Sequence, residues 1–100
     1  MLKHIVMWTL KEHAEGADRA ANAREMKRRL DECAHIVPGM HAFEVAIAQP
    51  GMEATYDIVL YAEFEDRQAL EAYARHPVHQ ALVPFVGAVR EQRQCMDYEV

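Results

Sequence analysis

Apolar residues alternate with other residues along three segments of the chain, a period of two that is typical of β-strands. In Leu2–Leu10 the even positions are nearly all apolar, so this face is expected to pack on a core. Met40–Ala48 and Tyr56–Phe64 show the same alternation, and Arg93–Glu99 can form a last strand. The pattern therefore predicts a sheet of four strands.

Helical spacing replaces this alternation after the first and third strands. Asp18 is suited to cap a helix over residues 18–34, because its side chain can accept a hydrogen bond from a free N–H of the first turn. Asp66 can cap a second helix in the same way. The order β-α-β-β-α-β predicts an α+β protein of the ferredoxin-like (split βαβ) class, with a four-stranded antiparallel sheet and helices on one face. At this length we expect a single domain, residues 1–100.

The second face of the sheet has no helix to cover it. The alternation assigns to this face seven large apolar residues, namely Ile5, Met7, Phe43, Val45, Ile47, Val59 and Tyr61. An exposed patch of that size marks an interaction site. We therefore predict a homodimer in which two protomers pack sheet against sheet about a two-fold axis, which closes a dimeric α/β barrel.

Proline interrupts the second helix. Pro77 disfavours a helical conformation at His76 and lacks an N–H, but it fits the first position of a new helix. The ring of His76 can cap this new helix, and Pro84 is expected to end or kink it. The break fixes the directions of Tyr73 and His79 relative to each other.

An imidazole beside a phenol is a candidate acid–base pair, because histidine titrates near neutrality. His79 would remove an acidic proton next to a carbonyl group, while the Tyr73 hydroxyl would donate to the developing oxyanion. The alternative is that both side chains only pack between two helices, with the hydroxyl bonded to a backbone carbonyl. The sequence is compatible with both interpretations.

His4 is the one polar residue on the apolar face of the first strand, so it must be hydrogen-bonded or line a cavity. A ligand pocket at this point would have as its walls Val6, Trp8, Ile58 and Leu60. Trp8 and Phe85 are also large enough to fill such a pocket. The sequence does not decide whether the pocket is open.

Charge and composition exclude several classes of function. The formal charge is −5 without a long basic run, so nucleic acid is not expected as a partner. No apolar run reaches membrane-spanning length, so no membrane partner is expected either. Cys33 and Cys95 are far apart, and no two histidines show the helical metal-binding spacing. We expect a cytoplasmic protein with no metal and no cofactor.

Several short motifs follow one another in an order that resembles the stress-responsive dimeric α/β-barrel (Dabb) family. These motifs are Leu2-Lys3-His4-Ile5-Val6, Ile36-Val37-Pro38-Gly39, Phe43-Glu44-Val45, Tyr56-Asp57, Glu63-Phe64-Glu65, Ala69-Leu70-Glu71-Ala72-Tyr73, His76-Pro77-Val78-His79-Gln80 and Asp97-Tyr98-Glu99. The resemblance covers essentially the full length. It implies a ferredoxin-like protomer whose sheet meets that of a second copy.

The best-understood enzyme of that family is olivetolic acid cyclase, which closes a linear polyketide by an intramolecular aldol reaction without a cofactor. The resemblance places its catalytic histidine at His79, the tyrosine partner at Tyr73 and a further pocket histidine at His4. It also implies that Leu82 lines the pocket, as a bulkier residue than its counterpart. Ile58 stands where the cyclase has another histidine.

The fold alone does not choose among the functions that it can host. The first is binding of a small, mostly apolar ligand, with a cofactor-independent cyclase, lyase or isomerase reaction on a carbonyl compound. The second is a non-catalytic, stress-responsive ligand-binding or structural dimer. The third is a cofactorless monooxygenase of the wider dimeric-barrel group.

Overall fold

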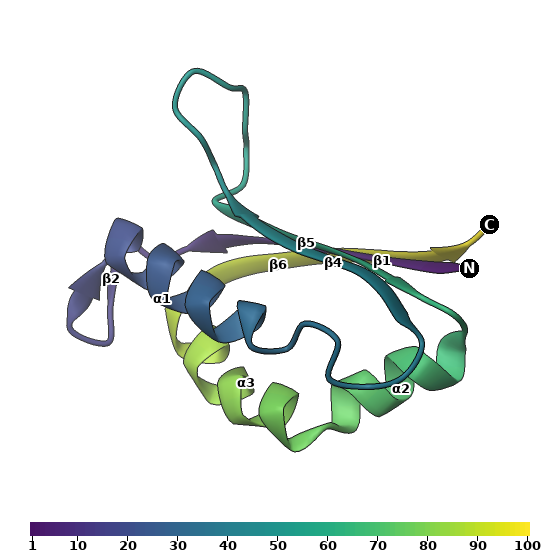
Figure 1. Ribbon diagram of the computed structural model, residues 1–100. Coiled ribbons are helices and arrows are strands. Elements are labelled where there is room, and N and C mark those ends of the chain that lie inside the picture. The colour runs from purple at the N-terminus through teal and green to yellow at the C-terminus, as the bar shows by residue number, and fades with distance from the viewer.

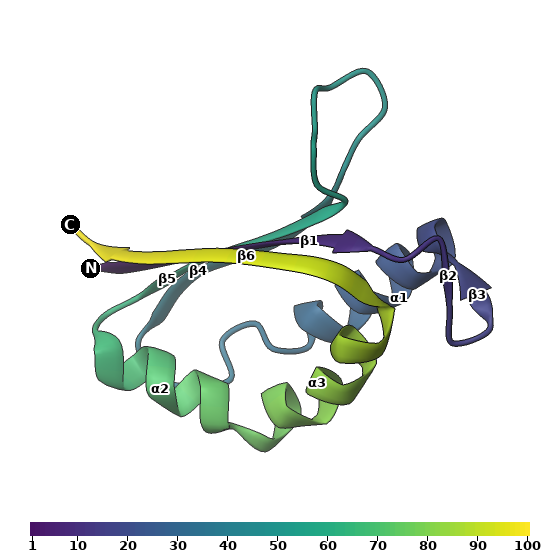
Figure 2. The same ribbon diagram turned by 180° about the vertical axis from the view of Figure 1, so that it is seen from behind.

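The computed structural model describes all residues from Met1 to Val100. Its elements follow in the order β1 (Leu2–Leu10), β2 (His13–Ala14), β3 (Ala17–Asp18), α1 (Arg19–Asp31), β4 (Met40–Ile47), β5 (Ile58–Phe64), α2 (Arg67–Arg75), α3 (Pro77–Val89) and β6 (Arg90–Glu99). Four strands form one antiparallel sheet in the order β4-β5-β1-β6, and β2 pairs with β3 in a separate small hairpin. The three helices lie on one side of the main sheet (Figures 1 and 2). This arrangement confirms the predicted ferredoxin-like α+β fold.

Side-chain caps start all three helices. Asp18 and Asp66 each accept a hydrogen bond from the backbone N–H three residues later, at 2.8 and 2.9 Å. The Nδ1 atom of His76 accepts from the N–H of Val78 at 3.1 Å. All three caps agree with the sequence, although α1 ends at Asp31, three residues earlier than predicted.

Pro84 was predicted to end or kink the third helix. It does not end the helix, because α3 continues to Val89. Proline leaves the carbonyl of Gln80 without its helical partner. Gln80 and Pro84 both lie on the solvent side, where water can bind that carbonyl. Buried residues on both sides of the proline, Leu82 and Val86, hold the helix against the sheet.

The core lies between the sheet and the helices. The most deeply buried large side chains come from both layers and include Val6, Leu10, Met26, Ile58, Phe64, Tyr73 and Val89. On β1 the even residues point into this core, as the alternation predicted. The burial of one apolar face of each layer is the main source of stability in a domain of this type.

The structure corrects the predicted orientation of β4. Phe43, Val45 and Ile47 were assigned to the open face, but they pair with Ala62, Leu60 and Ile58, which face the helices. Directly paired residues in an antiparallel sheet point to the same face. An extra residue between Met40 and Ala42 forms a bulge, so that Met40 and the three later apolar residues share one face. Alternation reveals two faces but not which one the helices cover.

The open face is nevertheless apolar. Ile5, Met7, Val59 and Tyr61 do lie on it, as predicted, and are only partly buried. Strand β6 adds Met96 and Tyr98, which pair with Ile5 and Lys3 and remain 65% and 37% exposed. The loop between β4 and β5 projects beyond this face (Figure 1).

Candidate functional site

A cavity of about 310 Å³ lies between the sheet and the helices. Seven of the eight predicted site residues line it, namely His4, Val6, Trp8, Leu60, Tyr73, His79 and Leu82. The eighth, Ile58, is buried in the sheet opposite Trp8 but does not reach the cavity. Phe85 does not fill it either, because its ring packs against the Arg29 guanidinium at 4.1 Å. Trp8 forms part of the wall.

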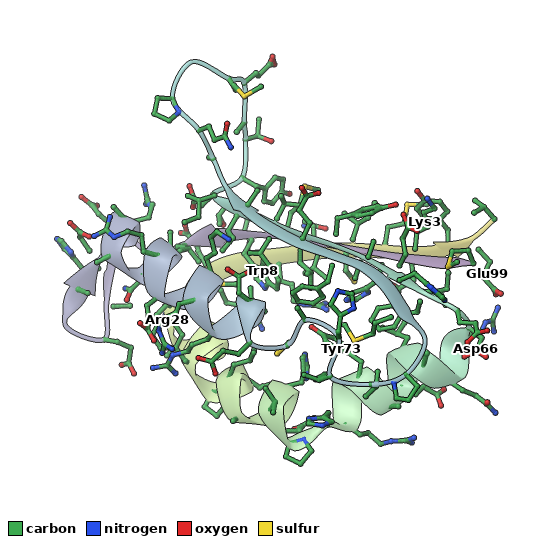
Figure 3. The ribbon with its side chains drawn as sticks, in the orientation of Figure 1. Lys3, Trp8, Arg28, Asp66, Tyr73 and Glu99 are labelled. Carbon is green, nitrogen blue, oxygen red and sulfur yellow. The ribbon has the colours of Figure 1, made fainter.

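Tyr73 projects from α2 toward the sheet and is 2% exposed (Figure 3). Its ring packs against those of His79 and Phe64, with centroid distances of 4.8 and 5.3 Å. Its hydroxyl makes no hydrogen bond in the protein, so the predicted alternative of a bond to a backbone carbonyl does not occur. Burial raises the pKa of this phenol well above its usual range, with a smaller contribution from Cys33. Tyr73 is therefore a protonated donor at neutral pH.

His79 follows the proline break, in the first turn of α3. Its Nδ1 atom lies 3.1 Å from the carbonyl oxygen of Ala74, which can only accept. The proton therefore resides on Nδ1, and Nε2 remains free to accept another. Burial is the main cause that lowers the pKa of His79, opposed by the bond to Ala74 and reinforced by the charges of His4 and Arg93. A neutral imidazole with a free Nε2 is the form that a general base requires.

The two rings touch, but no hydrogen bond joins His79 to Tyr73. Each has its polar atom free for a third molecule. The same bond from His79 to Ala74 also ties α3 to α2, so His79 contributes to helix packing as well. The predicted catalytic and packing roles are thus compatible in one residue.

His4 lines the cavity from β1 and is also hydrogen-bonded. The sequence predicted one or the other of these for a polar residue on an apolar face. Its Nδ1 atom is bonded to the carboxylate of Asp97, which is its direct partner on β6. A carboxylate behind an imidazole fixes the ring and its tautomer, as it does in many catalytic sites. The ring of His4 lies 6.4 Å from that of Tyr73, edge to face.

Sequence reasoning missed three polar residues at this site, all from β6. They are Asp97, which holds His4, and the cavity-lining Arg90 and Arg93. Every residue of β6 is exposed, and its sequence shows little contrast between apolar and polar positions. Only the pairing of β6 with β1 places Arg93 beside Trp8 at the cavity and Asp97 beside His4.

The indole N–H of Trp8 is buried without a hydrogen-bond partner, like the Tyr73 hydroxyl. Buried polar groups are satisfied in the great majority of cases, and an orphan costs about 1–3 kcal/mol. Two unsatisfied polar groups in the wall of one cavity are therefore unusual for a folded protein and indicate a missing partner. Both are donors, so a ligand oxygen could satisfy either one.

A second depression, of about 360 Å³, lies on the open face at the base of the loop between β4 and β5. Its walls are mostly apolar and include Met7 and Val59. It contains no histidine and no buried unsatisfied donor. We regard it as part of the open face and not as a chemical site. No three His, Cys, Asp or Glu side chains cluster as metal ligands, and none of the helices could span a bilayer.

Comparison with solved structures places the chain among small ferredoxin-like proteins. It is similar to a dimeric protein of unknown function from Bacteroides fragilis, with 28% identity, a TM-score of 0.80 and coverage of 99% of this chain and 95% of that one. A Dabb family protein from Mesorhizobium loti shows 26% identity, a TM-score of 0.73 and coverage of 99% and 95%. A putative antibiotic biosynthesis monooxygenase from Nitrosomonas europaea shares the fold at 20% identity, a TM-score of 0.76 and coverage of 100% and 98%. No curated protein matches the sequence.

The family comparison agrees with the motifs and with the fold. The family model described as the stress responsive A/B barrel domain (Dabb) matches residues 2–100, which is nearly the whole chain. Its pattern extends over both halves of the sheet and over all three helices. The chain therefore belongs to the Dabb family.

Proposed function

We propose that this protein is a homodimer that binds a small, mostly apolar carbonyl compound in the cavity and catalyses a proton transfer on it without a cofactor. The reaction would be of the cyclase, lyase or isomerase type. One observation carries the proposal: a free proton acceptor, His79 Nε2, and a free donor, the Tyr73 hydroxyl, line the same apolar cavity. A free proton acceptor beside a free hydrogen-bond donor is what enolisation of a ketone requires.

The chemistry follows from the protonation states. His79 Nε2 takes a proton from the carbon next to the carbonyl group, and the electrons of that C–H bond move toward the carbonyl oxygen. The Tyr73 O–H donates a hydrogen bond to this oxygen as its charge develops. The enolate can then be reprotonated at another carbon, or its carbon can attack a second carbonyl to close a ring. The imidazolium returns the proton to that other carbon in the first case, and to the alkoxide oxygen formed by ring closure in the second.

Dimerisation would proceed through the open face. The apolar side chains at its centre, Ile5, Met7 and Val59, lie on the side away from the helices. A chain of this size gains stability by burying such a patch against a second copy. The similar protein from Bacteroides fragilis is dimeric, which supports the same assembly here.

The direct test is exchange of carbon-bound protons. The neutral ketone 4-phenyl-2-butanone is incubated in D₂O with the protein, and loss of the proton signals next to the carbonyl is followed by NMR. We expect exchange faster than in buffer, and about a hundredfold loss of the added rate in His79→Ala. His41→Ala serves as the matched control, because His41 is exposed on β4 and lines no cavity.

A non-catalytic role is the second candidate, and the bond from His79 to Ala74 favours it. On this alternative His79 serves only to hold α3 against α2. The His79→Ala protein would then show a lower melting temperature, and neither it nor the wild type would accelerate exchange. The exchange assay separates the two candidates, because loss of the bond to Ala74 lowers the melting temperature on both.

A cofactorless monooxygenase would use the same cavity, with a substrate that itself reacts with oxygen. The likeness to the Nitrosomonas europaea protein concerns the fold, so its name does not assign this activity. Oxygen uptake with an anthrone, measured with an electrode, tests it. No uptake above the protein-free rate would exclude anthrone oxidation.

A further inference from the structure

Hydrogen-bond donors dominate the polar lining of the cavity. Trp8 and Tyr73 are 4% and 2% exposed. The indole N–H of Trp8 and the hydroxyl of Tyr73 have no hydrogen-bond partner. The ring nitrogen free to accept is Nε2 of His79, because Nδ1 of that ring is engaged with the carbonyl of Ala74. A ligand that satisfies the orphan donors must present oxygen acceptors to the inner wall.

Two guanidinium groups add to this excess of donors where the cavity opens. Arg90 and Arg93 line the cavity and belong to the exposed strand β6. Arg90 directly follows α3, and Arg93 pairs with Trp8. In that register Arg93 faces the same side of the sheet as the Trp8 ring.

Neither of these arginines has a carboxylate within 4.0 Å. Four of the eight arginines form ion pairs, namely Arg19, Arg28, Arg29 and Arg67, and the exposed Arg24 and Arg75 are unpaired like Arg90 and Arg93. The sole side-chain hydrogen bond of Arg93 goes to the sulfur of Cys95, a weak acceptor. Asp97, which lies on the same face of β6 as Arg93, is already bound to His4. Arg90 and Arg93 differ from the other unpaired arginines because both line the cavity, in a chain with a formal charge of −5.

The charge of Arg93 reaches the inner site. Arg93 is the smallest of the four contributions to the pKa of His79 and acts to lower it, in the same direction as burial. A negative group held at the opening would offset this effect. The inner donors and the outer cations therefore favour the same kind of molecule, one with negative or electron-rich oxygen at both ends.

We infer that the ligand is a small oxyanion with an apolar body, which places a carbonyl oxygen against Trp8 and Tyr73 and its anionic group against Arg90 and Arg93. The inference deepens the proposed function and rests on its claim that the cavity binds a carbonyl compound. A guanidinium fork matches both carboxylate and phosphate oxygens. A volume of about 310 Å³ is near the lower limit for ligand pockets, so the ligand is a small molecule.

The experiment compares a keto acid with its neutral amide, which differ only in the charged group, and adds an alkyl phosphate as a second anion. The keto acid 4-oxodecanoate, its neutral amide 4-oxodecanamide and octyl phosphate are titrated into the protein by calorimetry. Trp8 is the only tryptophan of the chain, so its fluorescence reports whether each probe enters this cavity. We expect the keto acid to bind about tenfold more tightly than the amide, and this preference to shrink as salt is raised.

Two charge-matched double variants localise the effect. Arg90→Gln/Arg93→Gln removes the cations of the opening, while Arg24→Gln/Arg75→Gln removes two exposed cations from α1 and α2 that line no cavity. The first variant is expected to bind acid and amide equally, and the second to keep the preference. Binding of octyl phosphate more tightly than the keto acid, lost in the first variant, would support the anion site at the two arginines and favour phosphate as the anionic group.

Other outcomes overturn the inference. If acid and amide bind equally to the wild type, or if the preference survives in Arg90→Gln/Arg93→Gln, the ligand is not selected for its charge. The proposed proton transfer is then still tested separately by the exchange assay with 4-phenyl-2-butanone. If neither keto compound binds, the inference fails, and the exchange assay with the neutral ketone shows whether the proposed function fails with it.

Discussion

The two faces of the sheet differ in what they lack: the helix-covered face has polar groups without partners, and the open face has apolar side chains without cover. On the helix-covered face the apolar side chains are buried, while two polar groups, on Trp8 and Tyr73, lack partners. On the open face the polar groups satisfy one another: Lys3 donates to the Tyr61 hydroxyl at 2.9 Å, and that hydroxyl donates to Glu63. Figure 3 shows Lys3 on the side of the sheet away from Tyr73.

What is unsatisfied on each face indicates what is missing there. A polar group without a partner in a small apolar cavity is satisfied by a small molecule. An exposed apolar area on a flat sheet is buried by contact with another protein surface. The helix-covered face is thus suited to chemistry and the open face to assembly, and the following experiments test that division.

The largest effect is expected from the same charge placed on each face of β1. Val6 is 1% exposed under the helices, and its neighbour Ile5 points to the open face. Val6→Asp buries an unpaired carboxylate and is expected to destabilise the protomer by about 4 kcal/mol or more, measured by urea unfolding. Ile5→Asp is expected to leave the protomer folded but to dissociate the dimer, measured by light scattering.

Ile5→Val serves as the size control for this pair, because it keeps the apolar surface and should remain dimeric. A dimer that persists in Ile5→Asp would show that the open face is not the interface. Circular dichroism of each variant establishes whether the protomer is folded. The division between the faces fails if both aspartate variants behave alike.

A smaller effect is expected from removing one hydroxyl on each face. Tyr61→Phe breaks the bonds to Lys3 and Glu63 and is expected to cost about 0.5–1 kcal/mol of stability. Tyr73→Phe removes a buried group that has no partner, so stability should be unchanged or about 1 kcal/mol higher. The free energy of unfolding in urea measures both. Equal losses in the two variants would mean that Tyr73 does have a partner in solution.

The parts of this structure that the sequence predicts are the local ones. The strand alternation and the caps at Asp18, Asp66 and His76 each depend on a few neighbouring residues. The placement of Tyr73 and His79 side by side is also local, because Pro77 fixes how α3 leaves α2.

What the sequence does not predict depends on strand pairing. The bulge after Met40 decides which side of the sheet Val45 faces, and nothing in the alternation of β4 announces it. The position of Arg93 at the cavity and that of Asp97 beside His4 follow from the register of β6 on β1. A strand whose residues are all exposed gives no apolar contrast from which that register could be read.

The smallest expected effect is that the two faces lose stability in different pH ranges. The pKa of His79 is lowered from 6.5, chiefly by burial, so the unfolded chain binds this proton more readily than the folded one. Its stabilising contribution is complete above 6.5 and is lost as the pH falls through the lower folded value. The pKa of Glu63 is lowered from 4.5, chiefly by the hydrogen bond from Tyr61, so its contribution persists to more acidic pH and is lost below 4.5.

Urea unfolding of the wild type, His79→Gln and Glu63→Gln over a pH series separates these contributions, because each variant is compared with the wild type at the same pH. The other histidines titrate in all three proteins and cancel in the difference. His79→Gln should flatten the decline that begins below 6.5, and Glu63→Gln should flatten only the decline below 4.5. An unchanged decline in His79→Gln would mean that the ring is accessible to water in both protonation states. The helix-covered face would then not provide the dry environment that its proposed chemistry needs.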